Sequence, residues 1–201
     1  MPDLLCCFRT RDHPIRLSSE FRLDLKWWHD FLTSWHGVSL WLFSGMSAPT
    51  DMEVTSDAAG SLGFGAYYNN ERFSGAWVPS QADQSIPYKE LFPVVVASHV
   101  WSSQWSRRQV LFRSDNSAVV HILLARTPKV PYIMRLLRHL LSAAARFNFT
   151  FTSPHIPDVH NNIADALSRF HWQDFRRLAP TAQLHPVAIA PQLWELLILS
   201  P

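Results

Sequence analysis

The sequence predicts an α/β domain built on a five-stranded mixed sheet, with three antiparallel strands, two parallel strands and flanking helices. Two observations support this prediction. Three short runs rich in β-branched and aromatic residues follow one another between residues 52 and 77, with turn residues between them. Two later runs, 109–114 and 149–153, alternate with segments of helical periodicity, which is typical of parallel strands joined by helical crossovers.

The first three strands are predicted to form an antiparallel meander. They are expected at 52–57 (MEVTSD), 64–68 and 72–77. The segment AAGSLG turns the chain after the first strand. Asn69-Asn70 forms the hairpin between the other two, because asparagine tolerates the left-handed backbone that a tight hairpin needs. These three strands supply the antiparallel part of the sheet.

Apolar residues at helical spacing predict four helices after the meander. They are expected at 88–105, 116–124, 132–147 and 161–169, after a loop at 79–87. The first helix turns Leu91, Val94, Val95 and His99 inward, and the third carries a continuous apolar stripe along one face. With the two later strands, the order of elements is βββαβααβα.

The regions on either side of this domain differ from it in composition. We predict three regions: a helical connection at 1–50, the compact domain at 51–170, and a proline-containing linker at 171–201. In the first region, Ser18 or Ser19 caps a helical pattern at 17–35, and an apolar stretch follows at 38–43. Four tryptophans there favour a docking surface or a core over a ligand cage. The last region holds one candidate helix at 192–199.

Composition excludes several classes of protein. The 201 residues are 47% hydrophobic with a net charge of +2, which excludes a wholly disordered chain. No apolar stretch approaches the ~20 residues of a membrane span, and the N-terminus lacks a signal-peptide core. We therefore expect an intracellular protein, in the cytoplasm or the nucleus, with no membrane partner. Cys6 and Cys7 are adjacent and without other cysteines, so free thiols are favoured over a disulfide framework or a zinc site.

Four acidic residues stand where an acid is structurally awkward. Asp57 ends the first strand, Glu90 lies in the first turn of the long helix, Asp115 ends the fourth strand, and Asp165 lies among apolar residues of the last helix. Each alone has an ordinary explanation, such as a helix cap or a charge that complements the helix dipole. If the first and fourth strands are parallel neighbours, however, Asp57 and Asp115 come side by side, and the helices add the other two.

Four converging carboxylates repel one another, so such a cluster is tolerable only with divalent cations bound. Ligands that are all oxygen favour Mg²⁺ or Mn²⁺ over zinc. Two such ions about 4 Å apart are a standard apparatus for in-line attack on a phosphodiester.

Four motifs carry a resemblance to a known family. They are TSDAAGSLGFGAY (55–67), YKELFPV (88–94), RSDNSAVV (113–120) and HIPDVHNNIADALSR (155–169). In this order they resemble the ribonuclease H domain of a retroelement polyprotein, and they imply a ribonuclease H-like fold. The flanks are similar to elements of the DIRS type. The resemblance therefore implies a reverse transcriptase domain upstream in the same polyprotein and a tyrosine recombinase downstream.

The resemblance implies an activity and a site. The activity is endonucleolytic hydrolysis of the RNA strand of RNA/DNA hybrids during reverse transcription, which leaves 5′-phosphate ends. Asp57, Glu90, Asp115 and Asp165 match the family's catalytic, metal-binding carboxylates for two Mg²⁺ ions, for which Mn²⁺ can substitute. Asp57 would bridge the two ions. Glu90 and Asp115 would share the ion at the leaving 3′ oxygen, and Asp165 would hold the ion that activates water.

Four further residues are candidates around this site. Asn116 and the backbone near Gly60 are candidate contacts to the hybrid, whose 2′-hydroxyls distinguish RNA from DNA. Asn161 is expected to order the closing loop. His160 is a candidate auxiliary residue, although a surface histidine is the commoner interpretation. In related enzymes a longer loop carries this histidine, and at the position of His155 they often have tryptophan.

The connection between the two middle helices is only seven residues, ARTPKVP. It therefore lacks the basic, aromatic protrusion that helps cellular ribonucleases H to grip hybrid. Few phosphates would be neutralised, so affinity for hybrid should be weak without a polymerase domain. The alternative function is a catalytically dormant or domesticated module that serves as a scaffold or interaction domain, and the tryptophan-rich first region favours it.

Overall fold

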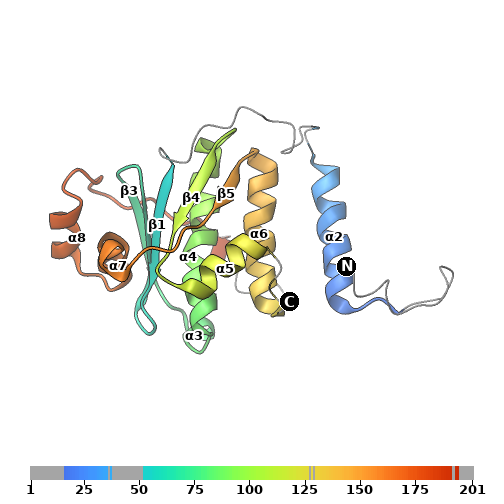
Figure 1. Cartoon of the computed structure of the whole chain (residues 1–201), viewed down its shortest axis with the longest axis horizontal. Coiled ribbons are helices and arrows are strands. Elements are labelled where there is room, and N and C mark those ends of the chain that lie inside the picture. The colour runs from blue at the N-terminus through green and yellow to red at the C-terminus, as the bar shows by residue number, and fades with distance from the viewer. Residues whose placement is uncertain are drawn as a thin grey trace. The chain divides into compact units, whose positions relative to one another are not determined.

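The computed structural model describes residues 16–35, 37, 52–126, 128, 130–191 and 193–194. The chain divides into two compact units, Met1–Trp35 and His36–Pro201. In the first unit the structure describes helix α2 (Ser19–Thr33) (Figure 1). The backbone N–H of Phe21 donates to Ser18 Oγ at 3.2 Å, which confirms Ser18 as the cap of the predicted helix.

The second unit contains the predicted sheet. Its strands are β1 (Glu53–Ala58), β2 (Gly63–Tyr68), β3 (Glu71–Ala76), β4 (Gln109–Arg113) and β5 (Thr150–Thr152), in the order β3-β2-β1-β4-β5. The first three pair antiparallel, whereas β4 pairs parallel with β1 and β5 parallel with β4. Asn69 and Asn70 have φ angles of 47° and 65°, as a tight hairpin requires. The strand order and pairing confirm the predicted fold class, a five-stranded mixed sheet with three antiparallel strands, two parallel strands and flanking helices.

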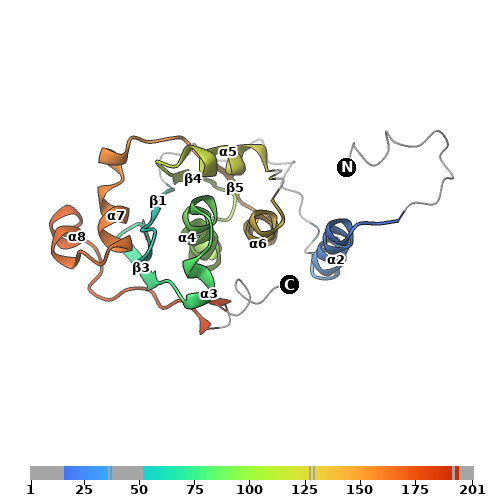
Figure 2. The same cartoon turned by 90° about the horizontal axis from the view of Figure 1, so that it is seen from below.

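Helices cover both faces of the sheet. They are α3 (Pro79–Ala82), α4 (Ile86–Trp101), α5 (Ser117–Ala125), α6 (Pro131–Phe147), α7 (Asn162–Ser168) and α8 (Trp172–Leu178). Figures 1 and 2 show α7 and α8 on one side of the sheet and α4 and α6 on the other. Because side chains alternate along a strand, Phe64, Ala66 and Tyr68 of β2 join the main core, while Tyr67 packs against the smaller cluster under α7 and α8.

The long helix differs in detail from its prediction. It begins at Ile86, with a proline in its first turn, and ends at Trp101, where the 3₁₀ turn Ser102–Gln104 follows. Leu91, Val94 and Val95 are buried as predicted. His99 is exposed, so its predicted inward position is wrong.

The segment predicted as a linker at 171–201 packs against the sheet in its described part, residues 171–191 and 193–194. Helix α8 lies in it, and Phe175, Ala179 and Ala182 form part of the smaller core. An extended stretch then follows the open edge of β3, where the N–H groups of Gln183 and Val187 donate to the carbonyl oxygens of Asn70 and Arg72, both at 2.8 Å. Prolines exclude a regular helix here but permit an extended edge segment.

Other predictions fall on parts of the chain outside the described residues. These are the apolar stretch 38–43, the adjacent cysteines and most of the candidate helix 192–199. Leu193 and Trp194 are described, and the Trp194 ring lies 5.5 Å from that of Phe64 and 6.0 Å from that of Phe92. Among the described helices, none is long and apolar enough to cross a membrane.

Candidate active site

The parallel pairing of β1 with β4 brings two of the predicted acids together. Thr55 of β1 lies opposite Arg113 of β4 in the register of this pair. Asp57 and Asp115 each follow two residues later, so both reach the same edge of the sheet. Glu90 joins them from the second turn of α4, the helix that packs against β1 and β2.

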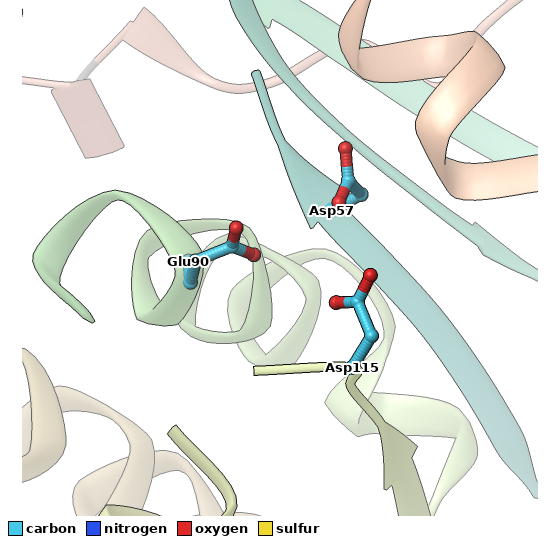
Figure 3. Close-up of side chains that lie close together, drawn as sticks. All are labelled: Asp57, Glu90 and Asp115. Carbon is cyan, nitrogen blue, oxygen red and sulfur yellow. The ribbon is translucent and has the colours of Figure 1, made fainter. Parts of the chain in front are cut away.

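Asp57, Glu90 and Asp115 form a three-carboxylate group. Each offers one carboxylate oxygen, and these oxygens all lie within 4.8 Å of one another. Figure 3 shows the three carboxyl groups meeting from β1, from α4 and from the loop after β4. Asp57 is buried, whereas Glu90 and Asp115 are partly buried. Residues far apart in the sequence therefore converge at one point, as the sequence predicts for these three.

Burial raises the pKa of all three acids, and nearby negative charges add to the effect. Burial raises the pKa of Glu90 to about 8, and the charges of Asp57 and Asp115 add to this effect, against a hydrogen bond from the backbone of Ala58. Burial also raises the pKa of Asp57 to about 6, assisted by Asp115 and Asp165. The pKa of Asp115 is raised, chiefly by burial. In the absence of a cation, Glu90 is therefore mostly protonated at neutral pH.

The three-carboxylate group fits a hard divalent cation. Its donors are all carboxylate oxygens, which suit Mg²⁺ or Mn²⁺ better than zinc. Among the described residues, no salt bridge reaches these three acids. A bound cation would offset the burial and the neighbouring negative charges that raise the pKa values of these acids.

The structure does not bring Asp165, the fourth predicted ligand, into this group. Its Oδ1 accepts a hydrogen bond from Arg169 Nε at 2.6 Å, one helical turn further along the chain. Its charge nevertheless contributes to the raised pKa of Asp57, and that of Arg169 opposes it. Asp165 thus lies within electrostatic reach of the three-carboxylate group, and its role as a metal ligand stays a prediction.

The predicted accessory residues take different places. Asn116 caps α5, since its Oδ1 accepts hydrogen bonds from the N–H groups of Ala118 at 3.0 Å and Val119 at 3.2 Å. Gly60 follows β1, and His160 is exposed at the end of the 3₁₀ turn Asp158–His160. Their roles at the site stay predictions.

Asn161 ties the start of α7 to the site. The side chain is buried, and its Nδ2 donates to the carbonyl oxygen of Ser56 at 3.0 Å. It also hydrogen-bonds the Asp115 carboxylate, which lowers the pKa of that group. These two contacts agree with an ordering role for Asn161 in the closing loop.

Sequence reasoning missed three residues that contact the site or the turn beside it. Ser168 Oγ donates to Asp57 Oδ2 at 2.5 Å, and Asp158 raises the pKa of Asp115 from close range. The buried Lys89 donates to the carbonyl oxygens of Gly60 and Ala82. The signal for Lys89 is a lysine in a helix that is mostly apolar apart from its neighbour Glu90. Nothing in the spacing of the sequence connects Ser168 with Asp57.

Comparison with known proteins gives two structural likenesses. No family model matches the chain, and no curated protein matches it. The chain is similar to the N-terminal RNase H domain of a Mycobacterium tuberculosis protein, with 16% identity, 57% of this chain and 93% of that chain covered, and a TM-score of 0.42. It is also similar to RNase H1 from Halobacterium salinarum, with 14% identity, coverages of 61% and 96%, and a TM-score of 0.45.

Proposed function

We propose that the chain is a metal-dependent endoribonuclease that hydrolyses the RNA strand of RNA/DNA hybrids. The observation that supports this most directly is the three-carboxylate group of Asp57, Glu90 and Asp115, whose oxygens lie within 4.8 Å of one another. It lies where two parallel strands end, beside a helix that adds the third acid. The four motifs that carry the resemblance contain all three of these residues.

Asp57, Glu90 and Asp115 would hold Mg²⁺, with Asp165 completing a two-ion site. When bound, the ions supply an activated water and stabilise negative charge on the phosphate. The chain's own residues position these carboxylates at one edge of the sheet. Asn116 follows Asp115 directly, and its side-chain amide is a donor suited to a 2′-hydroxyl. Gly60, in the turn after β1, would let backbone approach the hybrid.

We place this activity within a retroelement polyprotein, with a reverse transcriptase upstream and a tyrosine recombinase downstream. The support is the sequence resemblance of the motifs and flanks. The short connection between α5 and α6 adds to it, because a domain with little grip of its own would depend on a polymerase to hold the hybrid.

The test is cleavage of an RNA/DNA hybrid labelled on the RNA strand, in Mg²⁺, in Mn²⁺ and in EDTA. We expect metal-dependent cutting of the RNA strand with 5′-phosphate ends. Asp57→Asn should lower the rate at least ~100-fold, because metal ions supply several kcal/mol of transition-state stabilisation. Asp174→Asn, which alters an exposed acid paired with Arg177 on α8, is the matched control.

Cleavage of single-stranded RNA or duplex DNA at the same rate would contradict the proposed substrate. Wild-type activity in Asp57→Asn would contradict the proposed site. If folded wild-type protein does not cut, the assay is repeated with a reverse transcriptase domain fused upstream, and absence of cutting there would contradict the proposed activity.

A second candidate function, an interaction module, is favoured by α2. None of its residues is buried; Trp28 in the helix is 48% exposed, and Trp35, two residues after its end, is 45% exposed. The rings of Trp27 and Phe31 stack at 5.4 Å and support this aromatic surface. If interaction is the function, Trp28→Ala should weaken partner binding and Asp57→Asn should not. If Asp57→Asn instead abolishes cleavage of hybrid and Trp28→Ala leaves it unchanged, the enzyme is favoured.

A further inference from the structure

Ser168 contacts the three-carboxylate group from outside it. The side chain is completely buried at the end of α7, and its Oγ donates to Asp57 Oδ2 at 2.5 Å. A hydroxyl that donates to a carboxylate at this distance makes a short, charge-assisted hydrogen bond. We infer that Ser168 is a positioning residue, which fixes the orientation of the Asp57 carboxylate for metal binding.

The helix that carries Ser168 is held tightly against the sheet. A Cβ atom at Gly65 of β2 would lie 2.4 Å from Leu167 Cβ, so the close approach of α7 depends on the glycine. At the other end of α7, Asn161 Nδ2 donates to the carbonyl oxygen of Ser56. Both ends of α7 are therefore tied to consecutive residues of β1, and the Ser168 hydroxyl has little freedom to move.

This contact restricts the Asp57 carboxylate. A carboxylate otherwise rotates about its Cβ–Cγ bond, and rotation would break the hydrogen bond to the buried hydroxyl. Metal ligands held by such hydrogen bonds bind with less reorganisation, and loss of a supporting partner typically lowers metal affinity or activity by about 10–100-fold. Ser168 would thus act through Asp57 without touching the metal or the substrate.

Removal of the hydroxyl should leave the fold intact. Ser168 Oγ also lies 3.0 Å from the carbonyl oxygen of Asp165. The hydroxyl could therefore donate within its own helix instead of to Asp57. Ser98 is a matched control for that local role. It is also completely buried in a helix, and its Oγ donates to the carbonyl oxygen of Val95 at 2.7 Å. The described hydrogen bonds give Ser98 no carboxylate partner.

The inference rests on the proposed metal-dependent activity, and the experiment therefore uses a readout that needs no hybrid. Full-length wild type, Ser168→Ala and Ser98→Ala are titrated with Mn²⁺, and free Mn²⁺ is measured by electron paramagnetic resonance. Cleavage of hybrid is then followed against Mg²⁺ concentration. We expect Ser168→Ala to weaken Mn²⁺ binding about 10-fold and to raise the half-maximal Mg²⁺ concentration by a similar factor. Ser98→Ala should change neither by more than about 2-fold.

The outcomes separate this inference from the proposed function. Weaker Mn²⁺ binding in Ser168→Ala, with no hybrid cleavage by wild type even when a reverse transcriptase domain is fused upstream, would support the positioning role and overturn the proposed activity. Equal Mn²⁺ binding by Ser168→Ala and wild type would overturn the positioning role, whatever the hybrid assay shows. Equal weakening in Ser98→Ala, or no Mn²⁺ binding by wild type, would also overturn it. Should Ser168→Ala fail to fold, Ser168→Cys, with similar volume and a weaker donor, gives the same comparison.

Discussion

The ammonium group of Lys89 donates a hydrogen bond to the carbonyl oxygen of Gly60 at 2.5 Å, and so joins the first turn of α4 to the turn after β1. A second bond, to the carbonyl oxygen of Ala82 at 2.6 Å, joins it to α3. The next residue, Glu90, accepts a hydrogen bond from the backbone of Ala58. Two consecutive residues of α4 therefore fix the end of β1, from which Asp57 projects.

Lys89→Met should lower the free energy of unfolding by about 1–3 kcal/mol, because two carbonyl oxygens lose a charged donor while the side chain keeps its length. Urea unfolding checks this. Lys26→Met, which replaces an exposed lysine of α2, should change stability by less than about 0.5 kcal/mol. Equal stability of Lys89→Met and wild type would show that the two bonds contribute nothing net.

The raised pKa values make the metal-free protein less stable as pH rises. The folded protein holds a proton on Glu90 up to about pH 8, against a usual pKa of 4.5, and on Asp57 up to about pH 6, against 3.8. At a pH between the usual and the raised pKa of each acid, the folded state binds more protons than the unfolded state. The stabilisation from these protons is therefore fully present at low pH, and it is lost as pH rises through the pKa values of the folded protein. Thermal unfolding in EDTA at about pH 5 and about pH 8.5 measures the loss.

Mg²⁺ at millimolar concentration should reverse this trend, because a bound cation stabilises the ionised carboxylates of the folded state only. We expect the melting temperature to rise on addition of Mg²⁺ at high pH, and to rise less at low pH. A melting temperature that does not respond to Mg²⁺ at either pH would count against a formed metal site.

Asp115→Asn should separate stability from activity. The amide has nearly the shape of the acid but removes one charge that repels Asp57 and Glu90. In EDTA near neutral pH the variant should therefore melt at a higher temperature than wild type, while cleavage of hybrid falls at least ~100-fold. Calorimetry and the hybrid assay test the two halves. A lower melting temperature in EDTA would contradict mutual repulsion.

Local signals explain why much of this fold is predictable from sequence. Asn69-Asn70 marks the hairpin, and acids at the ends of β1 and β4 meet because the register of a parallel pair follows from the ends of its strands. The ion pair of Asp165 with Arg169 had a signal too, since acid and base four residues apart face each other on a helix. The contact of Ser168 with Asp57 had none, because it depends on how closely α7 packs on β2, which no local pattern specifies.

The C-terminal segment shows a second limit of local patterns. Its prolines predict a linker, but the segment packs against the sheet, where Arg72 of β3 contacts it. The guanidinium lies over the rings of Trp172 at 5.2 Å and Phe175 at 5.0 Å, and its Nη2 donates to the carbonyl oxygen of Leu184 at 3.2 Å. A buried charge is tolerated only where other groups contact it, and here those groups come from a distant part of the chain. The composition of the segment does not reveal such contacts.

Arg72→Ala should therefore destabilise the folded unit by about 2–4 kcal/mol, because a desolvated cation–π contact and a charged hydrogen bond are lost together. Urea unfolding of the full chain gives the value, and limited proteolysis should show earlier cleavage between residues 179 and 191. Arg177→Ala is the control, since this arginine pairs only with exposed Asp174 among the described salt bridges and such pairs contribute about 0–1 kcal/mol. If both variants unfold like wild type, the edge segment is not held by Arg72. If Arg72→Ala is destabilised and the hybrid assay at low temperature is unchanged, the segment stabilises the sheet without contributing to the site.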